Sequence, residues 1–165
     1  MKKVKGSYFS PDIQEFLLLL AEHEVRYVIV GGEAVIYYGY ARLTGDVDFF
    51  YEASPENVQK LYDALLEFWE HNIPGIEKPE ELLEPGVILQ FGVVPNRMDL
   101  LNRMDNLNFE EVWANRETFT IKIHRREIPV YFIGLDQLIK NKEAVARYKD
   151  LEDLKYLKKV QQQRK

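Results

Sequence analysis

The stretch Tyr27-Val28-Ile29-Val30-Gly31-Gly32 is followed, after the thirteen residues 33–45, by Asp46-Val47-Asp48-Phe49. The first stretch is short, apolar and rich in β-branched residues, which predicts a buried strand that ends at the diglycine. The second predicts a strand over residues 46–51, with both aspartates on one face and Val47 and Phe49 pointing into the core. Between them, residues 33–38 are expected to form a short helix that stops at a glycine.

Helical and strand patterns are intermixed along the rest of the chain. Two serine–proline pairs mark helix starts, because the serine hydroxyl caps a helix and proline suits its first turn. The predicted helices cover 11–24, 55–69, 109–115 and 134–165, and the last is broken near Arg147. The predicted strands cover 87–94, 97–101, 119–123 and 128–132, and an irregular excursion covers 70–86. This order predicts an α/β (α+β) fold, in which helices flank a mixed sheet.

Length and composition limit the class of protein. The 165 residues suit one domain over 1–165, in which 134–165 form a C-terminal helical extension. The absence of cysteine excludes disulfides, thiolate nucleophiles and cysteine-based metal sites. The longest apolar run, Phe16–Ala21, is much shorter than the ~20 residues that span a bilayer. We therefore expect a cytoplasmic protein that does not cross a membrane.

Charge is distributed unevenly along the chain. The formal net charge of -5 is not typical of a nucleic-acid-binding protein. Residues 140–165, however, hold nine basic and four acidic side chains, a local charge of +5. This basic tail is either a solvated helix face or an anion-attracting flank beside a phosphate site.

Three acidic residues lie in predicted strands. Asp46 and Asp48 place two carboxylates side by side, and like charges this close are hard to keep ionised. A divalent cation relieves the repulsion, and oxygen ligands favour Mg²⁺, Mn²⁺ or Ca²⁺. Asp99 is an acid in an apolar strand, and it joins the pair if its strand lies beside theirs. The alternatives are two solvated aspartates and a local pair between Asp99 and Arg97, which share a face.

The diglycine Gly31-Gly32 has two interpretations. Glycine lets a phosphate approach the backbone, and a helix start offers free N–H groups to it. Alternatively, the two glycines only make a tight turn from strand to helix. Glu33 either complements the helix dipole or repels a triphosphate, and its role stays open.

Together, Gly31-Gly32, Asp46-Val47-Asp48 and a later Asp99 resemble the signature of the polymerase-beta-like nucleotidyltransferase superfamily. Residues 38–48 are similar to the "His-Gly, Arg-x-Thr-x-Asp-x-Asp" version of small bacterial and archaeal members related to abortive-infection toxin nucleotidyltransferases. Tyr38 stands where histidine often precedes the glycine, and we expect this to change packing without loss of metal. Residues 139–150 resemble the C-terminal "Lys, then Arg, then Lys-Asp" helix motif of the same proteins.

The resemblance implies a nucleotidyltransferase fold, a metal site and a reaction. Asp46, Asp48 and Asp99 would hold two Mg²⁺ ions, with Mn²⁺ as a substitute, and would be the catalytic residues. Asp46 and Asp48 would bridge both ions, and Asp99 would complete the site that activates the acceptor hydroxyl. The reaction would move a nucleoside monophosphate from a nucleoside triphosphate such as ATP to that hydroxyl, with release of pyrophosphate.

The resemblance also implies residues that bind the nucleotide. Gly31 and Gly32 would cradle the β- and γ-phosphates, and Lys142 would place a cation on the triphosphate unless it is one more exposed lysine. Arg42 either contacts phosphate or, as we favour, pairs with an acid to support the aspartate strand. The roles of Thr44 and Asp150 stay open, although Asp150 would share a helix face with Lys142 in an unbroken helix.

Two other functions use the same residues. A metal-dependent phosphodiesterase would use water as the acceptor, and a catalytically silent module would bind nucleotide or act as one half of a toxin–antitoxin pair. Retention of three mutually repelling carboxylates favours an enzyme. The acceptor is an RNA 3′ end, a protein hydroxyl or a small molecule, and a homodimer or a partner protein would complete its binding surface.

Overall fold

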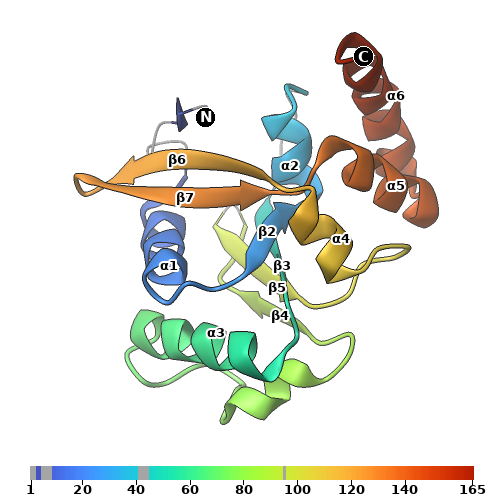
Figure 1. Ribbon diagram of the computed structural model, residues 1–165. Helices are drawn as coiled ribbons and strands as arrows, with labels where there is room; N and C mark the ends of the chain where they lie inside the picture. The colour runs from blue at the N-terminus through green and yellow to red at the C-terminus, as the bar shows by residue number, and fades with distance from the viewer. Residues whose placement is uncertain (1–2, 5–8, 41–44, 95) are drawn as a thin grey trace.

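A mixed β-sheet forms the centre of the computed structural model, which describes residues 3–4, 9–40, 45–94 and 96–165 (Figure 1). Seven strands within these ranges follow the order β1-β6-β7-β2-β3-β5-β4. Their bounds are β1 (Lys3–Val4), β2 (Tyr27–Val30), β3 (Asp46–Tyr51), β4 (Ile88–Phe91), β5 (Arg97–Leu101), β6 (Glu117–Ile123) and β7 (Arg126–Phe132). The predicted mixed sheet with flanking helices is confirmed.

The pairing of the central strands sets the geometry of the site. β2 lies between β7 and β3, and all four of its residues are buried, as the apolar composition predicts. β3 runs antiparallel to β2 and parallel to β5. In this register Asp48 lies opposite Val30 on one side and Asp99 on the other. The end of β2 and the two acidic strands therefore meet at one place in the sheet.

α1 (Pro11–Glu22) and α3 (Pro55–Phe68) begin where the serine–proline pairs predict. The Ser10 hydroxyl accepts a hydrogen bond from the Ile13 N–H at 3.4 Å, and the Ser54 hydroxyl accepts one from the Asn57 N–H at 3.2 Å. α1 stops two residues before the predicted end because Glu24 adopts a left-handed conformation, with φ 54°. The two helices pack against each other on one side of the molecule (Figure 1).

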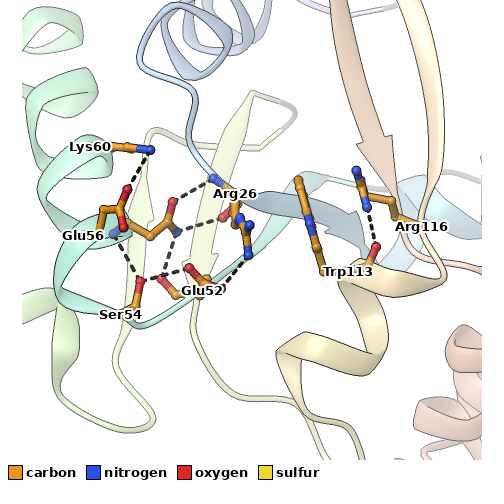
Figure 2. A network of polar contacts seen from close by, with 8 residues as sticks. Arg26, Glu52, Ser54, Glu56, Lys60, Trp113 and Arg116 are labelled. Carbon is orange, nitrogen blue, oxygen red and sulfur yellow. Dashed lines mark hydrogen bonds and ion pairs between the residues drawn. The ribbon is translucent and has the colours of Figure 1, made fainter.

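A buried amide joins the far ends of β2 and β3 to α3. Asn57 donates hydrogen bonds to the carbonyls of Arg26 and Glu52 at 3.0 and 2.9 Å, and it accepts one from the Arg26 N–H at 2.8 Å. Figure 2 shows this network together with the Ser54 cap and the ion pair between Arg26 and Glu52. Because Arg26 precedes β2 and Glu52 follows β3, the network fixes their register at the end opposite the acidic residues.

The short helix after β2 differs from the prediction. α2 (Gly31–Tyr37) starts at the first glycine, not at Glu33, so the diglycine is its first turn. Val30, which precedes the helix, is still extended, and Gly31 has a positive φ of 67°. The chain passes from strand to helix without a connecting loop, because glycine tolerates this conformation.

The segment between α3 and β4 is irregular, as expected, with one 3₁₀-helix, η2 (Pro79–Leu83). The predicted strand over 87–94 is too long. β4 ends at Phe91 because the chain turns at Gly92, whose φ is 78°, and the Asn96 N–H closes the turn onto the Val93 carbonyl at 2.8 Å. α4 (Phe109–Ala114) follows β5, and the predicted hairpin is β6–β7.

The C-terminal helical segment is broken as predicted. α5 (Leu135–Val145) ends at Ala146, which is left-handed with φ 53°, and α6 (Tyr148–Gln163) begins after Arg147. The two helices pack together on the side of the molecule away from α1 and α3 (Figure 1). Tyr156 of α6 also stacks on Tyr40, just after α2, with ring centroids 4.9 Å apart. None of the helices in the described ranges combines the length and apolar character that crossing a bilayer requires.

Candidate active site

Three carboxylates converge at the meeting point of β3 and β5. One oxygen from each of Asp46, Asp48 and Asp99 lies within 4.8 Å of the others, and no second group of this kind occurs among the residues that the structure describes. Asp48 and Asp99 are direct neighbours across the parallel strands, and Asp46 is two residues from Asp48 on the same face. Val47 and Phe49 alternate with them and are buried, as predicted. The donor set consists of oxygens and suits a hard divalent cation such as Mg²⁺ or Mn²⁺.

The start of α2 lies directly against the acidic group. A Cβ atom placed on Gly31 would be 2.2 Å from Oδ2 of Asp48, a separation that real side chains do not tolerate. The positive φ of Gly31 independently disfavours any other residue. Two physical constraints, the close approach to Asp48 and the positive φ, therefore require glycine at position 31. The missing side chain lets the backbone at the start of α2 lie close to Asp48.

Crowding changes the acidity of all three carboxyl groups. Burial, followed by the charges of Asp46 and Asp99, raises the pKa of Asp48 to about 8. Burial also raises the pKa of Asp99, with a further contribution from Asp46. In Asp46 burial acts in the same direction, but hydrogen bonds with Arg97 and the neighbouring carboxyl groups outweigh it and lower the pKa. Added positive charge would let Asp48 ionise fully near neutral pH.

Arg97 already supplies one positive charge to this group. Its Nη2 donates to Oδ2 of Asp46 at 2.9 Å, and its Nε donates to Oδ1 of Asp99 at 3.1 Å. Both alternatives for Asp99 therefore occur together, since it converges with the other acids and also pairs with Arg97. The hydrogen bond to Asp46 is the main reason that the pKa of Arg97 is raised.

A second ionic cluster joins α5 to α6. The Nζ of Lys142 lies 3.0 Å from Oδ1 of Asp150 and 3.0 Å from Oδ2 of Asp153, and the Lys142 side chain is only 5% exposed. Lys142 is thus not an exposed tail lysine, and both of its carboxylate partners are buried. Asp150, whose role the sequence left open, contacts Lys142 although the helix between them is broken at Ala146.

Arg147 is hydrogen-bonded to this cluster through Asp150. Its backbone N–H and its Nε both donate to Oδ2 of Asp150, at 3.0 and 2.8 Å, while its side chain stays 61% exposed. Its pKa is raised first by the hydrogen bond to Asp150 and further by the charge of Asp48. The guanidinium is therefore hydrogen-bonded to Asp150, and it is close enough to Asp48 for the charge of that carboxylate to contribute to its raised pKa.

The geometry agrees with the comparison to known families. Residues 11–162 match the family described as "Nucleotidyltransferase of unknown function (DUF6036)". The chain belongs to this family. The match covers most of the chain, and it confirms the nucleotidyltransferase resemblance. No curated protein matches the sequence.

The remaining residues that the sequence singled out are placed as follows. Tyr38 is buried, and its hydroxyl is 2.7 Å from the Ile133 carbonyl and also contacts the Glu117 carboxylate. Glu33 lies in the first turn of α2. Arg42 and Thr44 fall outside the described residues, so their roles stay predictions.

Arg97 and Arg147 were not among the predicted site residues. The pair between Arg97 and Asp46 depends on the β3–β5 register, which local patterns do not reveal. Arg147 carried a weak signal, because it directly precedes a predicted helix and has an acid three residues later. Only the fold brings Arg147 close enough to Asp48 for the charge of that carboxylate to contribute to the raised pKa of Arg147.

Proposed function

We propose that this chain is a Mg²⁺-dependent nucleotidyltransferase that moves a nucleoside monophosphate from a nucleoside triphosphate to an acceptor hydroxyl. The observation that carries the proposal is the convergence of Asp46, Asp48 and Asp99 beside Gly31. Membership of a nucleotidyltransferase family supports it at a coarser level.

In the proposed reaction, the acceptor hydroxyl releases its proton to solvent, and its oxygen forms a bond to the α-phosphorus of the triphosphate. The bond from that phosphorus to the bridging oxygen breaks, and pyrophosphate leaves with the electron pair. When bound, Mg²⁺ supplies positive charge at the attacking and leaving oxygens. Asp46 and Asp48 would hold the shared metal positions, and Asp99 would complete the position on the acceptor side. Such chemistry needs positioning and charge neutralisation more than a nucleophilic side chain.

The triphosphate would lie against the start of α2. Gly31 and Gly32 place backbone N–H groups there, and no side chain of their own blocks the approach of a phosphate. Because Gly31 touches Asp48 closely, a phosphate bound at the diglycine would also be next to the metal positions. This proximity supports the assignment of both glycines to the β- and γ-phosphates.

Arg147 is the cation that we assign to the triphosphate. It is largely exposed, near Asp48, and oriented by Asp150. Lys142 has a different geometry, since its ammonium contacts two buried carboxylates. We therefore propose that Lys142 acts through Asp150, as a residue that positions Arg147.

The reaction can be tested with α-labelled nucleoside triphosphates in the presence of Mg²⁺, with and without cellular RNA and protein. Label transferred to a macromolecule or small acceptor, with stoichiometric pyrophosphate, would support the proposal. The matched variants are Asp48→Asn, which should lose transfer, and Asp12→Asn, which removes an equal charge from the exposed start of α1 and should keep it.

The other two functions give different outcomes in the same assay. Label released to water without transfer would identify a phosphodiesterase. Saturable nucleotide binding with no turnover in any condition would identify a silent module.

A further inference from the structure

Arg97 lies inside the acidic group because of the strand register. Arg97 is the direct neighbour of Asp46 across β3 and β5, and it shares a face of β5 with Asp99, two residues later. The strand register therefore places Arg97 next to both Asp46 and Asp99, and its guanidinium contacts both carboxylates. The side chain is 33% exposed, so it borders solvent on one side.

The carboxylate oxygens that Arg97 contacts belong to the proposed metal ligands. It contacts Oδ2 of Asp46 at 2.9 Å and both oxygens of Asp99, at 3.1 and 3.4 Å. An ion held by all three acids would have to take an oxygen of Asp99 that Arg97 already contacts. A guanidinium and a divalent cation this close also repel each other.

From these contacts we propose that Arg97 is a built-in counter-ion of the metal site. In the metal-free protein it keeps Asp46 and Asp99 together, and it must leave one or both carboxylates when a divalent cation binds. Arg97 thereby weakens metal binding and stabilises the metal-free fold. This inference rests on the proposed metal site and adds a residue that sets the affinity of that site.

The test is a titration of the purified chain with Mn²⁺, followed by the electron paramagnetic resonance signal of the free ion. Arg97→Met keeps the length of the stem and removes the charge, so we expect Mn²⁺ to bind about tenfold tighter or more. Arg103→Met is the matched control, because it removes the same charge from an exposed position just after β5. It should leave the affinity close to that of the unchanged protein.

Thermal unfolding gives a second readout that needs no turnover. Without metal, Arg97→Met should melt at a lower temperature than the unchanged protein, because three crowded carboxylates lose their counter-ion. Saturating Mn²⁺ should raise the melting temperature of the variant by more than it raises that of the unchanged protein. If the variant folds only when Mn²⁺ is present, that result also supports the proposal.

Each remaining outcome has one meaning. Equal or weaker Mn²⁺ binding by Arg97→Met would overturn the role of Arg97 and leave the proposed function standing. Binding by the variant alone would support the role strongly, since Arg97 would then exclude the ion. Absence of binding in both, with Asp48→Asn as the reference for an inactivated site, would overturn the proposed metal site together with this inference.

Discussion

Asp48 and Asp99 lie directly opposite each other on the parallel strands β3 and β5, and an oxygen of each is within 4.8 Å of the other and of Asp46. A sheet rarely places acids in this way without a counter-charge, because burial and repulsion both oppose ionisation. Among the described residues, the guanidinium of Arg97 is the counter-charge in contact with Asp46 and Asp99, and the start of α2 brings Gly31 close to Asp48. The arrangement is suited to receiving further cations.

Asp48→Asn separates activity from stability. The rate of nucleotidyl transfer should fall by about 100-fold or more, because the site loses a carboxylate that would hold the metal ions stabilising the charge that develops in the transition state. The metal-free protein should become more stable at pH 8, since a carboxyl whose pKa is raised to about 8 no longer has to ionise there. Transfer assays and thermal unfolding at pH 8 measure both effects. Unchanged transfer would remove Asp48 from the mechanism.

Gly31→Ala tests the close approach of α2 to the acids. The new Cβ would lie 2.2 Å from Oδ2 of Asp48 at a φ of 67°, so we expect a loss of about 2–4 kcal/mol in the free energy of unfolding and weaker Mn²⁺ binding. Gly75→Ala is the control, because its φ is 77° but nothing lies within 4 Å of the added atom. It should show only the backbone strain, about 1–2 kcal/mol. Equal effects of the two changes on Mn²⁺ binding would contradict the predicted approach.

Arg147→Ala tests the cation assigned to the triphosphate. The KM for the nucleoside triphosphate should rise about 10- to 100-fold, because a hydrogen bond to a charged group is lost. Lys149→Ala removes a charge from an exposed position two residues away and should change KM much less. Steady-state kinetics at fixed Mg²⁺ measure the difference. If both variants raise KM equally, the total positive charge of residues 140–165 would explain the effect, and the specific assignment of Arg147 to the triphosphate would be contradicted.

Asp150→Asn tests the buried cluster through pH. Burial alone would raise the pKa of Asp150, but hydrogen bonds from Arg147 and Lys142 outweigh it and lower the pKa to about 2. A carboxyl with a lowered native pKa contributes stability above about pH 4, and this is lost as the pH falls from 4 to 2. The variant should therefore be less stable than the unchanged protein by about 2–3 kcal/mol at pH 6 and nearly equal to it at pH 2. Denaturant unfolding at both pH values checks this, and a difference that does not change with pH would contradict it.

Sequence patterns predicted that Asp46 and Asp48 share one face of a strand, because such patterns are local. Asp46 and Asp48 alternate with buried residues of one strand, and the serine caps of α1 and α3 act within one turn. The placement of Asp99 beside them was a conditional prediction, since it needed β5 to be the neighbour of β3. Strand order depends on the whole sheet, and short patterns do not specify it.

The contacts that were not predicted join segments far apart in the chain. Arg97 reaches Asp46 across the strands, so its pairing partner follows from the register. Lys142 and Asp150 would share a face only in an unbroken helix, whereas they meet because the chain reverses at Ala146 and α6 packs on α5. The helix after the diglycine was predicted to begin at Glu33, and only the backbone conformation of Val30 and Gly31 shows that it begins at the first glycine.

The central claim is that Asp46, Asp48 and Asp99 hold divalent ions, and anomalous scattering from crystals soaked with Mn²⁺ and a non-hydrolysable nucleoside triphosphate tests it most directly. The account predicts manganese peaks roughly 2 Å from carboxylate oxygens of all three aspartates, with the triphosphate on the diglycine side. Manganese bound elsewhere, or a triphosphate bound with no ion at these carboxylates, would contradict it.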